Sequence, residues 1–187
     1  MHRTTDDLIA LLEPHYNSAV QYCRGLYSNR KDAEDGLQDA IINAIQHFRS
    51  LRDDSKFRSW FFTIITRTFY RSRRKQAGID KLFIPLKENH STFPDVYGEN
   101  HLEEREKIML AALDVLSENE RTAILLFEIG GLSLEEIRKV QNEKSISAVK
   151  SRLSRTRLKL RNTIIEMEKI NYEQGGKYDI KSWIPGR

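Results

Sequence analysis

The sequence contains few of the residues that form disulfides or tight turns. Among its 187 residues there are one cysteine, four prolines and nine glycines. The single cysteine, Cys23, excludes an internal disulfide and a cysteine-rich zinc site. Scarce glycine and proline argue against a β-sandwich or barrel, because such folds need many turns. No apolar run is long enough to span a bilayer, and Met1–Asp7 lacks the layout of a signal peptide, so we expect a cytoplasmic protein.

Excess charge of one sign is also small, at a net +4, but the charge is unevenly distributed. Residues 49–75 contain nine Lys or Arg and two acids, and residues 138–161 contain nine Lys or Arg and one acid. Residues 79–120, between the two blocks, contain ten acids and four bases. Two basic blocks separated by an acidic stretch indicate two contacts with one polyanion, and solvated helix faces are the ordinary alternative.

Apolar spacing predicts two helices within residues 7–48. The first ends before Asn29, and either Asn29 or Asp32 is expected to cap the second helix, over residues 33–48. The buried stripe of this second helix is predicted to consist of Leu37, Ile41, Ala44, Ile45 and Phe48.

A third helix is predicted to begin near Phe57 and to end by Gly78. Its core-facing positions recur at helical spacing and are Phe57, Trp60, Phe61, Ile64, Ile65, Thr68 and Phe69. Cations alternate with these aromatic residues, a composition that suits binding to a single nucleic-acid strand. Because the stripe itself is expected to form core, Phe62 and Tyr70, which lie off it, are the better candidates for stacking on bases.

Helical periodicity is lost over residues 76–105, which reads as a linker, and returns over residues 106–167. Ser117–Glu120 and Ser133–Glu136 each match a capping box at the start of a helix. Gly130–Gly131 is expected to end the first of these two helices, since glycine tolerates a left-handed C-terminal position.

A short helix, a polar turn and a long basic helix then predict a helix–turn–helix. The apolar residues expected to pack the pair are Leu134, Ile137, Val140, Val149, Leu153 and Leu160. The opposite surface of the basic helix holds Lys150, Ser151, Ser154, Arg155 and Arg157. Small hydroxyl residues between long cations let a helix enter the major groove, where the cations reach phosphates and guanine edges. A solvated basic helix in an ordinary bundle is the alternative.

Taken together, these segments resemble the extracytoplasmic-function sigma factors of the sigma-70 family. Residues 29–39 are similar to regions 2.1 and 2.2 of that family, and residues 57–62 to the start of regions 2.3 and 2.4. Residues 116–121 and the helix–turn–helix are similar to region 4. The resemblance implies an all-α protein with two helical domains.

The implied boundaries place region 2 at residues 1–76, a linker at 77–105 and region 4 at 106–170. Residues 171–187 form an extension with no counterpart in the minimal family pattern. By resemblance, region 2 binds core polymerase and melts the minus-ten element of a promoter, and region 4 reads the minus-35 element.

The resemblance also assigns candidate site residues. Contacts with the clamp of the polymerase β′ subunit are expected from Asp35, Gln38 and Asp39. Contacts with the minus-ten region, including a pocket for one flipped base, are expected from Arg52, Lys56, Phe57, Phe62, Thr66, Arg67, Tyr70, Arg71 and Arg74. Contacts with the minus-35 element are expected from Lys150, Ser151, Arg152, Ser154, Arg155 and Arg157.

The partners implied are core RNA polymerase, through its β′ clamp and β flap, promoter DNA and an anti-sigma factor. The resemblance also implies a cytoplasmic, nucleoid-associated protein that an anti-sigma factor can hold at the membrane. No cofactor, metal or small-molecule substrate is expected. In the turn of the helix–turn–helix the family's glycine is missing, so Asn142 is expected to take a left-handed conformation. Arg138 replaces a small residue of the family, so either it points outward or the packing of the two helices differs from that of the family.

Two other classes of function compete with this one. A plain helix–turn–helix regulator, such as a response-regulator effector domain, explains the second half of the chain but has no use for residues 33–38 or the aromatic–basic helix. An enzyme needs convergent carboxylates or histidines at ligand spacing, or a glycine-rich phosphate loop. The sequence has no such loop, and ligand spacing is absent among its five histidines, His2, His15, His47, His90 and His101.

Overall fold

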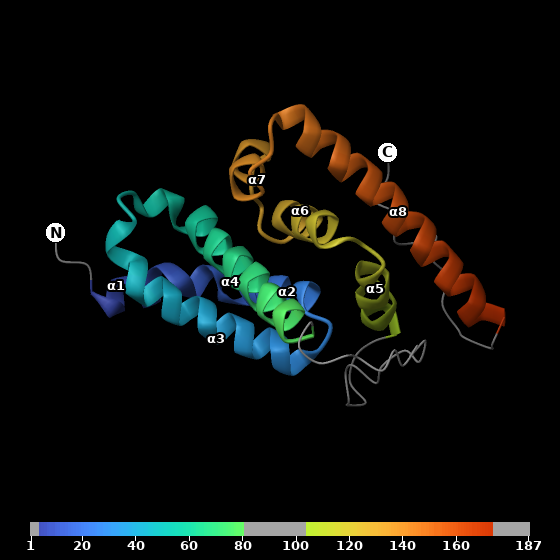
Figure 1. Ribbon diagram of the computed structural model, residues 1–187, viewed down its shortest axis with the longest axis horizontal. Helices are drawn as coiled ribbons and strands as arrows, with labels where there is room; N and C mark the ends of the chain where they lie inside the picture. Colours follow the sequence, from blue (N-terminus) through green and yellow to red (C-terminus); the bar gives the residue numbers. More distant parts are fainter. Residues whose placement is uncertain (1–3, 81–103, 174–187) are drawn as a thin grey trace.

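The structure of the protein is a computed structural model that describes residues 4–80 and 104–173, and these residues are helical with no strand (Figure 1). Their first part contains α1 (Thr5–Leu12), α2 (Tyr16–Leu26), α3 (Arg30–His47) and α4 (Phe57–Asp80), with short 3-10 turns at Glu13–His15, Phe48–Ser50 and Asp54–Lys56. The second part contains α5 (Glu104–Asp114), α6 (Glu118–Glu128), α7 (Leu134–Val140) and α8 (Ile146–Glu173). The prediction of an all-α fold is confirmed.

The start of the chain differs from the prediction in one respect. A single first helix is expected from the apolar spacing, but a 3-10 turn that contains Pro14 separates α1 from α2. Proline has no N–H to donate and its ring crowds the preceding turn, which disfavours a continuous α-helix. The next boundary is as predicted, because Asn29 caps α3 and its side-chain oxygen accepts a hydrogen bond from Asp32 N at 2.8 Å.

Helix α3 packs on α2 and α4 through small side chains. Its buried residues are Ala33, Gly36, Leu37, Ala40 and Ala44. Gly36 lies under the ring of Tyr27, where a Cβ atom would stand 2.4 Å from the tyrosine hydroxyl. The prediction that Ile45 belongs to the core is wrong, because 46% of that residue is exposed. The small residues of α3 let it pack closely on α2 and α4, and Ile45 lies on the exposed side of the helix.

Helix α4 is buried over more of its circumference than its stripe predicted. Phe61, Ile65 and Phe69 are at most 2% exposed, as expected. Phe62 was expected to be accessible because it lies off the stripe, but it is 0% exposed, so that expectation is wrong. The ring of Phe62 meets the ring of Tyr22 edge to face at 5.2 Å between centroids. Helix α2 therefore covers a second face of α4.

The second part of the structure follows its predicted caps closely. Ser117 with Glu120, and Ser133 with Glu136, form capping boxes at the starts of α6 and α7. Gly131, just after α6, has a φ of 60°, which glycine adopts without the penalty that a Cβ atom would bring. Helices α5, α6 and α7 all pack against α8.

The two parts lie against each other along α2 and α4 on one side and α6 and α7 on the other (Figure 1). One continuous cluster of buried apolar residues extends through both. Helix α4 continues to residue 80 and α5 begins at residue 104, so both ends of the predicted linker are helical. The rest of that linker, residues 81–103, and residues 174–187 of the predicted extension lie outside the described residues. None of the described helices combines the length and apolar character needed to cross a membrane.

Candidate nucleic-acid interface

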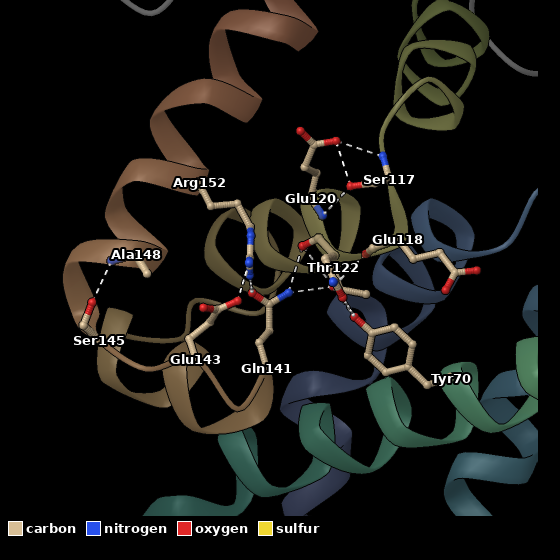
Figure 2. A network of polar contacts seen from close by, with 11 residues as sticks. Tyr70, Ser117, Glu118, Glu120, Thr122, Gln141, Glu143, Ser145, Ala148 and Arg152 are labelled. Atoms are coloured by element: carbon tan, nitrogen blue, oxygen red, sulfur yellow. Dashed lines mark hydrogen bonds and ion pairs between the residues drawn. The ribbon is translucent and has the colours of Figure 1, made fainter.

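Helix α8 presents a basic face to solvent. Val149 and Leu153 are at most 2% exposed and pack toward α7, as predicted for a helix–turn–helix. The exposed residues of the same segment are Lys150, Ser151, Ser154, Arg155 and Arg157. At the start of this helix the Ser145 hydroxyl accepts a hydrogen bond from Ala148 N at 3.1 Å (Figure 2). The packing of α8 thus leaves these five side chains on an accessible surface.

The turn between α7 and α8 is held without glycine. Asn142 has a φ of 52°, which confirms the predicted left-handed conformation. Arg138 is half-buried, and its guanidinium donates to Glu135 at 2.8 Å and to the Glu143 carbonyl at 3.3 Å. These bonds keep the guanidinium of Arg138 beside Glu135 and the turn, and its expected outward orientation stays a prediction.

Arg152 differs from its neighbours on α8, because its side chain turns back to the preceding turn. Its guanidinium donates to Gln141 Oε1 at 2.7 Å and forms an ion pair with Glu143 (Figure 2). Gln141 in turn donates to Thr122 Oγ1 and to the Asn119 carbonyl, both at 2.8 Å. In this structure the Arg152 side chain links the turn to α6, and the expectation that it contacts the minus-35 element stays a prediction.

Arg157 is exposed but already has partners. Its Nη2 lies 2.8 Å from a carboxylate oxygen of Glu128, and its guanidinium lies 4.9 Å from the ring centroid of Phe127. Both partners lie on α6, and half of each charged side chain is exposed. A surface pair of this kind is weak, so Arg157 can exchange the carboxylate for a phosphate at little cost.

Helix α4 and the loop before it expose a second group of cations. Arg67, Arg71 and Arg74 are exposed and follow one another at intervals of four and three residues, so they share one face of α4. Arg52 and Lys56, in the preceding loop, are exposed as well. All five cations are therefore accessible to solvent.

Three other residues of the predicted minus-ten set are inside the protein in this conformation. Phe57 is 1% exposed and its ring stacks against that of Phe61 at 5.7 Å. Thr66 is 1% exposed, donates to the Phe62 carbonyl at 2.7 Å and shares a 2.8 Å hydrogen bond with the Tyr22 hydroxyl. As placed here, Phe57, Phe62 and Thr66 have no surface that a nucleic acid can touch. Their aromatic and hydroxyl groups stabilise the core.

Tyr70 lies off the core stripe, as predicted, but it contacts α6. Its hydroxyl donates to Asn119 Oδ1 at 2.9 Å and lies 2.9 Å from Thr122 Oγ1 (Figure 2). Burial raises the pKa of Tyr70, and the hydrogen bond with Thr122 opposes that shift. Tyr70, the predicted stacking residue, is thus hydrogen-bonded to α6 in the second part of the chain.

The acidic face of α3 is open and includes apolar residues that the sequence patterns did not reveal. Asp35, Gln38 and Asp39 are all exposed. Ile42, 52% exposed, and Ile45 continue the same face at helical spacing. The signal that could have revealed them is the excess of apolar residues in this helix, more than one stripe can bury.

Comparison with known proteins identifies both parts. Residues 11–79 match the family model described as Sigma-70 region 2, and residues 106–160 match the model described as Sigma-70, region 4. The sequence is 27% identical over 163 residues to an ECF RNA polymerase sigma-E factor of Haemophilus influenzae, covering 82% of this chain and 86% of the relative. The chain belongs to the extracytoplasmic-function sigma factors of the sigma-70 family. Members of this family are transcription-initiation subunits that direct RNA polymerase to promoters.

Other sigma factors agree with this assignment. The RNA polymerase sigma factor SigV of Bacillus subtilis is 29% identical over 171 residues, which covers 88% of this chain and 94% of the relative. Among solved structures, the sigma factor RpoE in complex with the anti-sigma factor NepR from Bartonella quintana matches with a TM-score of 0.70 and 27% identity, over 86% of this chain and 98% of that chain. CnrH in complex with the cytosolic domain of CnrY has a TM-score of 0.58 at 21% identity, a likeness of fold alone.

In this sigma factor, region 4 rests directly on region 2. The Arg121 guanidinium of α6, which is 11% exposed, donates to the Leu26 carbonyl of α2 at 3.2 Å. Arg58 Nη2 of α4 lies 3.4 Å from the Ile129 carbonyl, at the end of α6. Arg73 and Glu118 form an ion pair of 2.8 Å. The contact between the two regions therefore combines these polar bonds with the apolar cluster that extends through both regions.

Proposed function

We propose that this sigma factor contacts core RNA polymerase through α3, the minus-ten element through the cations of α4 and its loop, and the minus-35 element through α8. The observation that carries the proposal is the division of α8 into two faces, with Val149 and Leu153 buried against α7 and Lys150, Ser151 and Arg155 exposed. Region 2 is assigned to residues 1–76, a linker to 77–105 and region 4 to 106–170.

For the minus-35 element, the reading residues are Lys150, Ser151, Ser154 and Arg155, with Arg157 at the edge. Their small and long side chains alternate on one exposed face, which suits insertion into the major groove. Arg152 supports these residues by holding the turn and is not itself a reading residue.

For the minus-ten element, the exposed cations Arg52, Lys56, Arg67, Arg71 and Arg74 track the strand. Melting is driven by differential binding: an extruded base gains a pocket and the exposed strand gains a cationic surface, which offsets a few kcal/mol of unstacking. The chain performs no covalent chemistry of its own in this scheme. Phe57, Phe62 and Thr66 contribute to the pocket only after region 2 rearranges, and Tyr70 only after its hydroxyl leaves Asn119 and Thr122 of α6.

For polymerase, the contact surface is the exposed face of α3. Asp35, Gln38 and Asp39 supply acidic and amide groups, and Ile42 and Ile45 supply apolar area beside them. An interface that combines apolar contacts with charged groups gains both affinity and orientation.

Regulation by an anti-sigma factor, with the sigma factor in the cytoplasm, completes the proposal. The structurally similar sigma factor RpoE was solved in complex with the anti-sigma factor NepR, and CnrH, of the same fold, in complex with the cytosolic domain of CnrY. Their presence on proteins of the same fold supports a partner of this class for this chain. An anti-sigma factor bound to the membrane would hold the chain there until a signal releases it.

The test is in vitro transcription with sigma-free core RNA polymerase on a promoter library. Wild-type protein should start transcripts from a discrete set of sites that share two sequence elements. The K150A/R155A double variant should lose most of this activity, and the control R161A/K169A, exposed positions farther along α8, should keep it. Absence of specific transcripts with the wild-type protein, or equal activity of the two double variants, would contradict the proposal.

A further inference from the structure

The turn between α7 and α8 is bonded to both helices through one acidic residue, Glu143. Arg138 of α7 donates from Nη1 to the Glu143 carbonyl at 3.3 Å, and Arg152 of α8 forms an ion pair with the Glu143 carboxylate (Figure 2). Each arginine has a second partner as well, Glu135 for Arg138 and Gln141 for Arg152. Glu143 therefore joins the two helices of the helix–turn–helix through directional polar bonds.

The ion pair of Glu143 differs from the other ion pairs of α8 in its burial. Both side chains of the pair with Arg152 are 20% exposed, whereas the side chains of the pair at Arg157 are 50% and 52% exposed. Solvent and salt screen a less exposed pair more weakly, so this pair holds its geometry better than a surface pair does. Glu143 is also the one acid in the basic stretch of residues 138–161. None of the contacts proposed above uses it.

The turn is also bonded to α6, so three helices meet at it. The Gln141 amide donates two hydrogen bonds of 2.8 Å to α6, and its oxygen accepts one from Arg152. Asn142, next in sequence, has a φ of 52°, a conformation that Asn adopts less freely than glycine. Side-chain bonds of the residues on both sides of Asn142 support this conformation. Polar contacts near the start of α8 therefore hold its orientation relative to α6 and α7.

The rotation of α8 about its own axis decides which bases its exposed residues can discriminate. Val149 and Leu153 are buried against α7, but apolar contacts are non-directional and leave a helix some freedom to rotate. A rotation of about 20° moves an atom at the helix surface, roughly 5–6 Å from the axis, by about 2 Å. Hydrogen bonds to base edges tolerate a change of only about 0.5 Å. A small rotation would therefore move Lys150 and Arg155 away from the bases proposed for them.

We propose that Glu143 is a positioning residue for minus-35 recognition. Through its bonds with Arg138 and Arg152 it fixes the rotation of α8 about its axis. That rotation determines which bases Lys150 and Arg155 discriminate. The inference rests on the proposed function and deepens it, because it names a residue that sets the specificity of α8 without touching DNA.

The test uses substitutions that remove the ion pair and keep most of the side-chain volume. E143Q replaces the carboxylate by an amide of the same size, and R152M keeps an unbranched side chain but no cation. The double variant E143Q/R152M completes a double-mutant cycle. E128Q is the matched control, because it makes the same change in the exposed pair with Arg157, an arginine that also belongs to α8 but lies outside the turn.

The readout is the base preference at each position of the minus-35 element, measured with the full chain and core RNA polymerase. The library is built on a promoter that the wild-type protein uses, with a randomised minus-35 element and a barcode in each transcript. Preference is the ratio of transcripts from the favoured base to transcripts from the other three. A variant that is only less stable lowers all transcripts by the same factor, so this ratio reports the orientation of α8 and not the amount of folded protein.

We expect the same ratios for the wild-type protein and E128Q. The ratios for E143Q and for R152M should fall about tenfold at the positions whose preference is lost in K150A and R155A, which is within the discrimination that one bidentate contact with a base supplies. The double variant should fall no further than either single variant, since all three lack the same ion pair.

Several results overturn the inference. Unchanged ratios in E143Q and R152M mean that the ion pair does not orient α8. A fall in R152M alone means that Arg152 contacts a base itself, and a fall in E143Q alone means that its charge acts without Arg152. Additive losses in the double variant mean that the two residues act separately, and an equal fall in E128Q means that the change in charge accounts for the effect.

Failure of the inference and failure of the proposed function give different results in the same experiment. In every case above, the wild-type protein still starts specific transcripts, so the proposed function stands and only the role of Glu143 is rejected. A wild-type protein that starts no specific transcripts contradicts the proposed function, and the role of Glu143 in minus-35 recognition fails with it.

Discussion

Helices α4 and α8 carry cations at the same density, yet they differ in how much of their surface is buried. Helix α4 has six Lys or Arg in 24 residues and α8 has seven in 28. Helix α4 buries a nearly continuous aromatic surface against α2 and α3 and is further covered by region 4. Helix α8 packs on α5, α6 and α7 but keeps Lys150, Ser154 and Arg155 exposed. Charge density alone therefore does not tell whether a basic helix is ready to bind DNA; the number of its packed faces does.

The largest expected effect tests whether α4 is primarily a core helix. Phe61 is 0% exposed, so F61A should leave a cavity and lower the free energy of unfolding by about 3–5 kcal/mol. Leu158 of α8 is 58% exposed, and L158A should change it by less than about 0.5 kcal/mol. Urea denaturation followed by circular dichroism measures both. Similar losses for the two variants would show that the helices do not differ in burial.

A smaller effect concerns the hydrogen bond buried between α2 and α4. T66V removes the hydroxyl that lies 2.8 Å from the Tyr22 hydroxyl, leaves that group unsatisfied and should cost about 1–3 kcal/mol of unfolding free energy. T163V, at a partly exposed position of α8, is the control for the same substitution in the other helix. Chemical denaturation measures the unfolding free energy of both variants. An unchanged unfolding free energy in T66V would mean that the Thr66 hydroxyl is not needed for stability and is available to contact DNA.

The third prediction separates two neighbouring arginines of α8. R155A should lower the slope of log affinity against log salt for duplex DNA by about 1, since one exposed phosphate contact is lost. R152A should leave that slope unchanged and lower the stability of region 4, because it frees Glu143 and Gln141 from their partner. Fluorescence anisotropy over a salt series, with thermal unfolding, distinguishes them. A lower slope in R152A would show that Arg152 contacts a phosphate of the DNA.

The smallest effect concerns the caps that position α6 and α7. Hydrogen bonds from the Ser117 backbone, the largest cause, and from its hydroxyl lower the pKa of Glu120 in the folded state. Because the folded pKa lies below the unfolded one, this stabilisation is complete above the unfolded value, near pH 4.5, and is lost as the pH falls through the folded value. E120Q should therefore flatten the acid dependence of stability and cost about 1 kcal/mol near neutral pH. Denaturation midpoints between about pH 3 and pH 7 test it, and an unchanged profile would contradict the role of the cap.

Local features of the fold were predictable because they depend on neighbours in the sequence. Asn29 as a cap, the two capping boxes, Gly131 and the left-handed Asn142 each follow from the conformational preference of one residue and its next turn. The division of α8 into packed and exposed faces was predictable because its apolar residues, Val149 and Leu153, recur at helical spacing. The family was predictable from the order of these features along the chain.

Features that depend on a second packed face were not predictable in this way. Phe62 and Ile45 were assigned to the wrong environments because a single apolar stripe cannot say where α2 lies on α4 or how closely small residues bring α3 to its neighbours. The bonds of Arg152 with Gln141 and Glu143 were not predictable either, because only the folded turn brings these residues within reach of it.

The amino-acid sequence by itself determined an all-α chain, the positions of its caps and turn, and two basic helices in the order typical of an extracytoplasmic-function sigma factor. Only the tertiary structure decided that α4 is enclosed on several sides, that Arg152 belongs to the turn and that region 4 rests on Gly25 and Tyr70 of region 2. The reason is physical: a helix cap needs atoms within one turn of the chain, whereas burial depends on surfaces that are far apart in sequence and meet only when the chain folds.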